Sequence, residues 1–326
     1  MRDKILDGFR AVAVSCVVLS HAASYRWGDV VQLHYLRRAS GSLAEVGVQI
    51  FFVISGLIIT SLLLREEAKG HGVSVAAFYA RRTLRILPLF LLMVALSSAD
   101  AASKAHAVTF TCNFAECAWG VAHSWSLAVE EQYYLAWPLL FIILRNHRTT
   151  FLVTTIVTLL CIYVLRPFTY HANALSFACI AVGALLAVQP TWRLKGRWLP
   201  WISSGTVLLV GPLFAEKATS LVTPFLVAYL ITAASDLRLV GRLLSSPPFQ
   251  WIGLASYSLY LWQQPFLAKS SSLPIYLLPL VVVASVYFVE RPFIRLGHRL
   301  SATIASRTKA KLGHSPLDRR DPTAKA

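Results

Sequence analysis

The stretch RAVAVSCVVLSH carries Arg10 at its start and His21 at its end, with only uncharged residues between them. At 100° per residue, the eleven helical steps bring both side chains to nearly the same face, about 20° apart. They lie roughly 16 Å apart along the axis, and Asp7 sits one turn before Arg10. Ionisable groups are costly in an apolar helix, so the spacing favours a functional role. The structural alternative is that Asp7 neutralises Arg10 and His21 caps the helix.

A second group of polar residues lies in HSWSLAVEEQYYLAWPLL, which contains His123, Ser126, Glu130 and Glu131. The stretch begins an apolar segment, and the topology derived below puts Glu130 close to the depth of His21. A carboxylate beside an imidazole holds the ring in one tautomer and makes it a better base. We therefore expect Glu130 to orient His21, with His123 and Glu131 as supporting candidates. Glu131 has the alternative of an interfacial residue without a catalytic part.

The third group is a cluster of arginines in FYARRTLRILP. Arg82 and Arg85 are three residues apart and share a helical face, and Arg81 adds to the positive patch. Arginine rather than lysine at every position favours bidentate recognition of phosphate. The alternative is the ordinary excess of positive charge at the inner end of a membrane helix.

The elements that must position these groups are apolar segments. The 326-residue chain is 56% hydrophobic and 14% charged, far more apolar than an ordinary soluble domain. Runs of about 18 apolar residues can cross a bilayer core of roughly 30 Å. Ten are predicted, at about 7–25, 46–64, 84–100, 125–144, 150–166, 174–189, 199–215, 218–235, 252–269 and 273–290. The expected fold is all-α and polytopic, with a transmembrane domain at 1–297.

The distribution of lysine and arginine predicts the orientation. With the N-terminus inside, 23 of the 31 basic residues fall on the cytoplasmic side and 7 on the outer side. Because positive residues stay inside, both termini are predicted to be cytoplasmic. The basic segment 298–326 is predicted to be a disordered tail. The net charge of +16 is spread over short inner loops and this tail, without an aromatic-interleaved basic patch, so no nucleic-acid partner is expected.

Two of the five cysteines, Cys112 and Cys117, fall in a predicted outer loop. An oxidising compartment would allow a disulfide there, and two free thiols are the alternative. The spacing of these cysteines to His106 and His123 matches no standard zinc pattern, so no metal is expected.

Six stretches together carry a family resemblance. LDGFRAVAVSCVVLSHA, GVQIFFVISGLIITSLLLREE, FYARRTLRILP, WSLAVEEQYYLAWP, GLASYSLYLWQQPF and VERPF occur in this order. They resemble the motifs of the membrane-bound acyltransferase family 3, which includes bacterial O-acetyltransferases of surface polysaccharides. The resemblance runs from residue 4 to about 297. It implies a multi-pass protein of the bacterial cytoplasmic membrane that moves an acyl group, typically acetyl, from acyl-CoA to a hydroxyl.

The resemblance also implies roles for individual residues. Arg10 and His21 match the essential arginine and histidine of the family, and Arg82 and Arg85 match its RxxR pair, associated with the acyl-CoA donor. Ser126 and Glu130 match its SLxxE block. One departure is Gln263, where many members have a histidine, and this concentrates the role of base on His21.

These observations combine into a mechanistic hypothesis. The phosphates of coenzyme A stay on Arg82 and Arg85 at the inner face, and the pantetheine arm reaches inward. His21 deprotonates an acceptor hydroxyl arriving from outside, Glu130 orients the imidazole, and Arg10 lines the donor path. A transporter or flippase without acyl chemistry is the alternative function. The acceptor, expected to be a carbohydrate or lipid-linked glycan, is not specified by the sequence, and neither is the oligomeric state.

Overall fold

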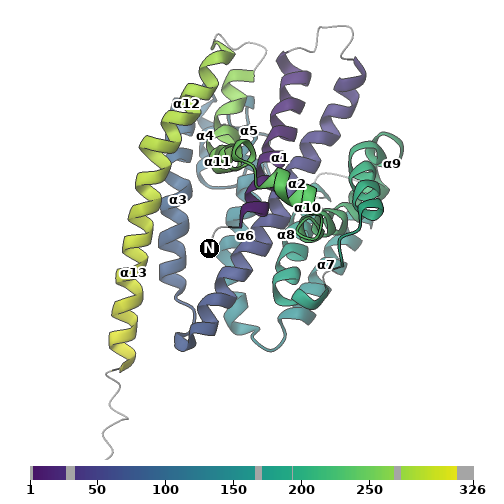
Figure 1. Cartoon of the computed structure of the whole chain (residues 1–326). Coiled ribbons are helices and arrows are strands. Elements are labelled where there is room, and N and C mark those ends of the chain that lie inside the picture. Colours follow the sequence, from purple (N-terminus) through teal and green to yellow (C-terminus); the bar gives the residue numbers. More distant parts are fainter. Residues whose placement is uncertain (1–2, 27–33, 166–170, 193, 268–272, 314–326) are drawn as a thin grey trace, which may run out of the picture.

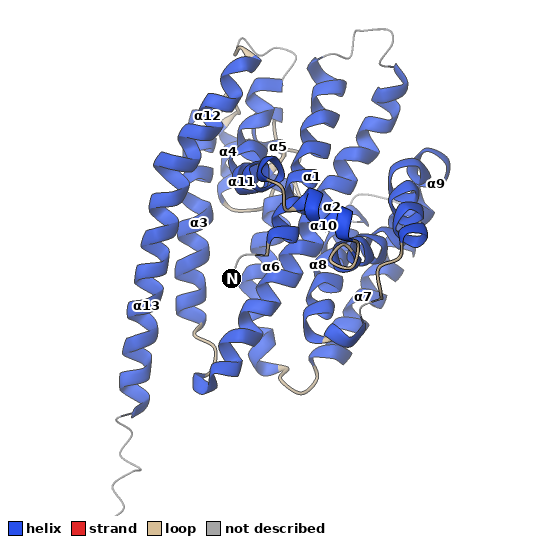
Figure 2. Cartoon of the chain, viewed as in Figure 1, coloured by secondary structure: helices blue, strands red, loops and turns tan. Residues whose placement is uncertain are grey.

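The computed structural model describes residues 3–26, 34–165, 171–192, 194–267 and 273–313. Within these ranges the chain forms helices and connecting loops, and none of the described residues belongs to a β-strand (Figure 1, Figure 2). The all-α class predicted from composition is therefore confirmed.

Each predicted apolar segment coincides with a helix or with one arm of a helix. The long helices are α1 (Lys4–His21), α2 (His34–Glu66), α3 (Val75–Leu96), α6 (Ser124–Ile143), α7 (Arg148–Leu165), α8 (His171–Val188), α9 (Trp198–Ala233), α11 (Pro247–Leu267) and α13 (Arg291–Gly313). The short ones are α4 (Ala101–Val108), α5 (Trp119–Ala122), α10 (Arg238–Leu244) and α12 (Leu278–Ala284), which the π-helix η6 (Ser285–Glu290) joins to α13.

The element α9 folds back on itself. A Cβ atom added to Gly211 would lie 2.7 Å from Oγ1 of Thr219, although the eight steps between them would span about 12 Å in a straight helix. Nε1 of Trp201 likewise donates to the carbonyl oxygen of Leu230 at 3.3 Å. The two arms of α9 are therefore neighbours, and they correspond to the separate seventh and eighth predicted segments.

Fewer helices meet the requirements for a membrane span than the ten predicted. Among the described residues, four are long and apolar enough: Lys4–Ser24, Leu43–Gly70, Arg148–Leu165 and Ile275–Ser306. A fifth is added if Ala218–Ala233 and Arg238–Leu244, bent by 94°, form one span. Helices α3, α6 and α11 fall short because they carry the arginines, glutamates and glutamines described below. The chain is thus a multi-pass membrane protein in which several long helices carry charged or amide side chains.

Glycines bring the backbones of α2 and α8 into contact. A Cβ atom on Gly56 would lie 1.9 Å from the carbonyl oxygen of Ile180, and one on Gly183 would lie 2.0 Å from that of Val53. Small residues at helix interfaces permit this close approach in a membrane, where burial of apolar surface gives little driving force. The crossing holds α2 against the centre of the bundle.

The same device fixes α11 against α1. A Cβ atom on Gly253 of α11 would lie 2.0 Å from the carbonyl oxygen of Asp7. A Cβ atom on Gly8 would lie 2.5 Å from the carbonyl oxygen of Leu244, the last residue of α10, which directly precedes α11. The two backbones therefore have one register relative to each other. This register decides which residues of α11 face His21 of α1.

Helix α13 continues into the segment that the sequence predicted to be disordered. It ends at Gly313, and its first part runs beside α3 (Figure 1). Gly297 packs on α3, since its added Cβ would lie 3.4 Å from Cα of Arg81, and Ser301 is buried. The prediction of disorder was therefore wrong for 298–313, because contact with α3 stabilises the helix. The rest of the predicted tail, 314–326, lies outside the described residues.

The α2–α8 contact generates a stability prediction. Gly56→Ala should destabilise the protein by about 1–3 kcal/mol, because the added methyl group forces the two backbones apart. Gly205→Ala is the matched control, since nothing lies within 4 Å of its added Cβ. Thermal unfolding of the purified variants in detergent measures the difference. Equal stability of the two variants would contradict the close crossing.

Candidate active site

Three cavities succeed one another along α1, and we name them by their linings. The histidine cavity, of about 380 Å³, is lined on α1 by Val17 and His21. The central cavity, of about 100 Å³, meets α1 at Arg10. The N-terminal cavity, of about 260 Å³, is lined on α1 from Asp3 to Arg10. Arg10 and His21 therefore share one face, as their spacing predicted, but they open onto different cavities.

Adjacent cavities share walls. Val48, Phe52 and Tyr260 line both the histidine and the central cavity. Arg10 and Arg85 line both the central and the N-terminal cavity. The three cavities thus form a series through the bundle, with one side-chain layer at each boundary.

His21 is held by an amide rather than by the predicted carboxylate. Its Nδ1 lies 3.2 Å from Oε1 of Gln263. The indole of Trp119 packs edge-on against the imidazole, with ring centroids 5.4 Å apart. An amide oxygen can only accept, so this contact selects the tautomer with a proton on Nδ1 and a lone pair on Nε2. Gln263, which the resemblance marked only as a departure, is therefore the residue that orients His21.

Glu130 does not orient His21, and this expectation was wrong. Its carboxylate accepts hydrogen bonds from Ser55 Oγ at 2.7 Å and from Tyr134 Oη at 3.2 Å. It lines the central cavity, whereas His21 lines the histidine cavity. The predicted depth along the membrane did not specify how α6 is rotated about its axis, and that rotation turns Glu130 toward Ser55 of α2.

His123 is the second imidazole of the histidine cavity. It is 2% exposed, and its Nδ1 lies 2.5 Å from Oε1 of Gln264. The same oxygen accepts the backbone N–H of His123 at 3.1 Å. Consecutive glutamines of α11 thus bind one histidine each. Gln264 had not been singled out in the sequence, although a second amide in an apolar helix is itself a signal of function.

Ser126 belongs to a hydrogen-bond network around Tyr260. Its Oγ lies 2.6 Å from Oη of Tyr260 and 3.2 Å from the carbonyl oxygen of His123. Tyr260 Oη also donates to that carbonyl at 3.1 Å. The network fixes the wall between the histidine and central cavities, so Ser126 of the SLxxE block has a structural contact in addition to its place in the cavity lining.

The arginines reach the interior of the bundle. Arg82 and Arg85 line the central cavity with Arg10, whereas Arg81 pairs with Glu66 at 3.2 Å. Arg10 pairs with Asp7 at 3.2 Å, as the structural alternative required. In the part of the chain that the structure describes, Arg82 and Arg85 form no ion pair within 4.0 Å. The central cavity therefore presents guanidinium groups with unused donors.

Two further acids lie near these arginines. Glu290 of the VERPF stretch is 7% exposed, accepts a hydrogen bond from Ser258 and interacts electrostatically with Arg85. Oε1 of Glu131 is buried and has no hydrogen-bond partner among the described residues, and the carboxylate interacts with Arg82. Glu131 therefore has one carboxylate oxygen inside the bundle, close to the arginine cluster. The sequence motif VERPF contains Glu290 but does not assign it a role. A charged residue in an apolar segment is the feature that could have identified it.

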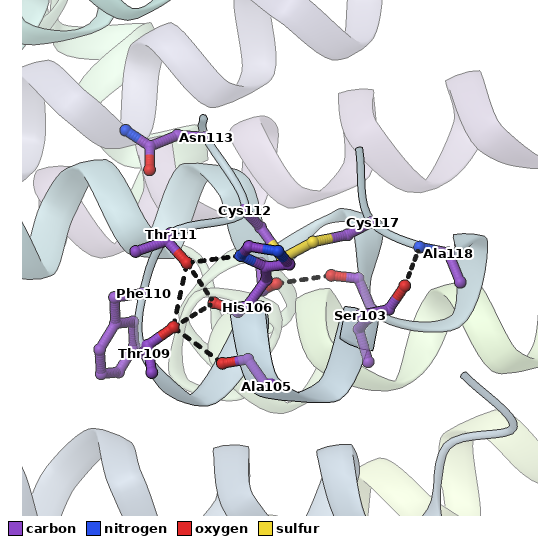
Figure 3. Close-up of a disulfide and its surroundings, with 12 residues drawn as sticks. Ser103, Ala105, His106, Thr109, Phe110, Thr111, Cys112, Asn113, Cys117 and Ala118 are labelled. Carbon is purple, nitrogen blue, oxygen red and sulfur yellow. Dashed lines mark hydrogen bonds between the residues drawn. A yellow bond between two sulfur atoms is a disulfide. The ribbon is translucent and has the colours of Figure 1, made fainter. Parts of the chain in front are cut away.

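A disulfide closes the loop beside the histidine cavity. Cys112 and Cys117 are bonded, which decides between the two alternatives left by the sequence (Figure 3). Ser103 accepts the N–H of Ala118 at 2.9 Å and donates to Asp100 at 2.6 Å, and its hydrogen bonds lower the pKa of Asp100. The described residues contain no cluster of three groups suited to a metal ion. The loop leads directly to α5, which carries Trp119 into the cavity.

Comparisons with known proteins identify the family of the chain. A family model described as "Acyltransferase domain" matches residues 3–289. The chain therefore belongs to this acyltransferase family, and the resemblance found in the motifs is confirmed. No solved structure matches the chain.

Three similar bacterial proteins have names that bear on function. The chain is 26% identical over 367 residues to the putative peptidoglycan O-acetyltransferase YrhL of Bacillus subtilis, covering 90% of this chain and 55% of YrhL. It is 26% identical to the O-acetyltransferase OatA of Staphylococcus aureus, covering 91% and 58%, and to the peptidoglycan O-acetyltransferase OatA of Listeria monocytogenes, covering 82% and 49%. The chain thus spans about half the length of these relatives, and none of the three printed names supports the transporter alternative.

Proposed function

We propose that this protein is a membrane-embedded O-acyltransferase that moves an acyl group, typically acetyl, from acyl-CoA to a hydroxyl of a glycan of the cell envelope. The observation that carries the proposal is the series of cavities, with guanidinium groups at one end and imidazoles at the other. Guanidinium groups bind phosphate and stabilise developing negative charge. Imidazoles accept the proton of a hydroxyl. The printed names of the relatives support an O-linked acetyl group and a peptidoglycan-like acceptor.

The donor enters through the N-terminal cavity in this proposal. Arg10, Arg65 and Arg85 line that cavity, and they supply donors for the phosphates of coenzyme A. The central cavity, at about 100 Å³, is smaller than the roughly 300–1,000 Å³ of ordinary ligand pockets. It therefore suits the thin pantetheine arm and the thioester rather than the nucleotide. This revises the expectation that Arg82 holds the nucleotide at the membrane surface.

His21 acts as the general base in the histidine cavity. The acceptor hydroxyl oxygen attacks the thioester carbonyl carbon as its proton passes to Nε2 of His21. The tetrahedral intermediate then collapses, the carbon–sulfur bond breaks, and the proton moves from His21 to the leaving thiolate. Gln263 positions the ring for both proton transfers, and Arg10 and Arg82 stabilise negative charge on the donor side. Glu130 balances the charge of Arg82 from its place between Ser55 and Tyr134.

We further propose that ten segments cross the cytoplasmic membrane, with both termini in the cytoplasm. The end of α13 and the α2–α3 connection lie at the same end of the bundle (Figure 1). The end of α13 is rich in basic residues, and five more basic residues lie between 65 and 85, in and around that connection. A cysteine introduced at Ser306 should therefore resist membrane-impermeant thiol reagents in intact cells and react after permeabilisation. Labelling of this cysteine in intact cells would contradict the proposed orientation.

The donor site yields a second prediction. The double variant Arg82→Ala/Arg85→Ala should lose acyl-CoA affinity on the order of 100-fold. It removes Arg85 from the proposed phosphate site and Arg82 from the central cavity that the pantetheine arm occupies, and each charge-assisted hydrogen bond contributes roughly 1.5–3 kcal/mol. Arg238→Ala/Arg242→Ala is the matched control, since both arginines are exposed on α10. Equilibrium binding of acetyl-CoA to protein in lipid nanodiscs measures the effect. Equal affinity of the two double variants would move the donor site elsewhere.

Acyl transfer itself is tested by thiol release coupled to acceptor acetylation. The wild-type protein should release coenzyme A in step with an O-acetylated glycan detected by mass spectrometry, which a transporter would not do. His21→Ala should lower this rate about 10²–10⁴-fold while retaining donor binding. His147→Ala, at an exposed histidine, should remain at wild-type level. A folded His21→Ala protein with near-normal transfer would remove His21 from the mechanism.

A further inference from the structure

The histidine cavity contains a buried hydrogen-bond acceptor on His123. Because Oε1 of Gln264 can only accept, Nδ1 of His123 carries the proton in that contact, at 2.5 Å. Nε2 of the neutral ring is then an acceptor. It is buried and has no hydrogen-bond partner in the described part of the chain.

Gln49 of α2 supplies a second unpaired acceptor to the same cavity. Its side chain is 4% exposed, and its Nε2 donates to Glu45 at 2.9 Å. Its Oε1 is buried and lacks a hydrogen-bond partner among the described residues. A buried polar atom without a partner costs about 1–3 kcal/mol. Two such atoms in one cavity indicate a ligand that supplies the missing donors.

The chemistry of the lining restricts this ligand to a neutral donor-rich molecule. Glu45 also lines the cavity, and with two further acceptors it disfavours a carboxylate or phosphate group. Trp119 and Trp125 add apolar ring faces, which suit the C–H faces of a sugar ring. At about 380 Å³ the cavity falls within the range of small-molecule sites. The hydroxyl groups of a pyranose can donate hydrogen bonds to the two unpaired acceptors, and its C–H faces can pack against the aromatic rings.

We infer that Nε2 of His123 and Oε1 of Gln49 bind neighbouring hydroxyl or amide N–H groups of the acceptor sugar while another hydroxyl faces His21. The inference rests on the proposed function for its identification of the cavity as the acceptor site. His123 and Gln49 are then positioning residues that select a polyhydroxylated ring over a simple alcohol. The central cavity has the opposite polarity, with guanidinium donors, so donor and acceptor are distinguished by the hydrogen bonds that each can make.

Two isosteric variants of His123 separate ligand binding from a structural role. In His123→Asn the amide nitrogen replaces Nδ1 and keeps the bond to Gln264, but the acceptor at Nε2 is lost. In His123→Gln the amide oxygen replaces Nε2, and the bond to Gln264 is lost. The probe is the neutral disaccharide N,N′-diacetylchitobiose, titrated calorimetrically into protein in lipid nanodiscs. Affinity should fall about tenfold in His123→Asn and change less than about threefold in His123→Gln.

Gln49→Leu gives an independent measurement on a second element. It should weaken binding of the disaccharide about tenfold, whereas Gln189→Leu, whose amide contacts Thr149 away from the cavity, should not. Cyclohexanol, with one hydroxyl, should bind wild type and Gln49→Leu equally. No saturable binding of the disaccharide to wild type, or the reverse order of the two His123 variants, would overturn the inference.

The outcomes also separate this inference from the proposed function. Wild-type protein that binds the disaccharide with the expected variant pattern but never acetylates a glycan would refute the transfer activity alone. Protein that transfers acetyl groups with an unchanged acceptor KM in His123→Asn and Gln49→Leu would refute the positioning role alone. Measurement of KM and kcat for the same disaccharide therefore completes the test, with an increase in KM expected in both variants.

Discussion

Two consecutive amide side chains on α11 hold two imidazoles that come from different parts of the chain. Gln263 faces His21 of α1, and Gln264 faces His123 at the start of α6. Successive helical residues point about 100° apart, so one turn of α11 reaches two neighbours at once. The contact of Gly253 with Asp7 fixes the register of α11 against α1. With another register, the two amides would not lie within hydrogen-bond distance of the histidines, and nothing would select one tautomer of each imidazole.

The polarity of the interior follows from the cost of burying charge. An unpaired charge in a low-dielectric bundle is expensive, and it persists where cavities or partners compensate it. Arg10 pairs with Asp7, and Glu130 accepts hydrogen bonds from Ser55 and Tyr134. The guanidinium groups of Arg82 and Arg85 line the central cavity. Of the helices that carry these groups, α3 and α6 are not among those apolar enough to count as membrane spans. Contacts between glycines and neighbouring backbones supply packing that does not depend on apolar surface.

The separation of donors and acceptors of hydrogen bonds into different cavities has a chemical consequence. A thioester and its phosphates need donors, whereas a sugar hydroxyl about to lose its proton needs an acceptor. The wall formed by Val48, Phe52 and Tyr260 divides these two environments. Ser126 and the carbonyl of His123 fix Tyr260 within that wall. In the proposed reaction, the donor and the acceptor therefore meet only if the thioester passes through a single layer of side chains.

The sequence determined what lies within one helix, and the tertiary structure decided what lies between helices. Helical geometry fixes 100° and 1.5 Å per residue, so the shared face of Arg10 and His21, the proximity of Asp7 and the helical segments were all readable from spacing. Six motifs in the expected order were enough to identify the family of the chain. Packing against other helices decides the rotation of α6 about its axis, and this rotation places Glu130 beside Ser55. Packing also decides the register of α11, and this register places Gln263 beside His21. No residue pattern within one segment encodes these contacts, and the same reason explains the packing of α13 on α3.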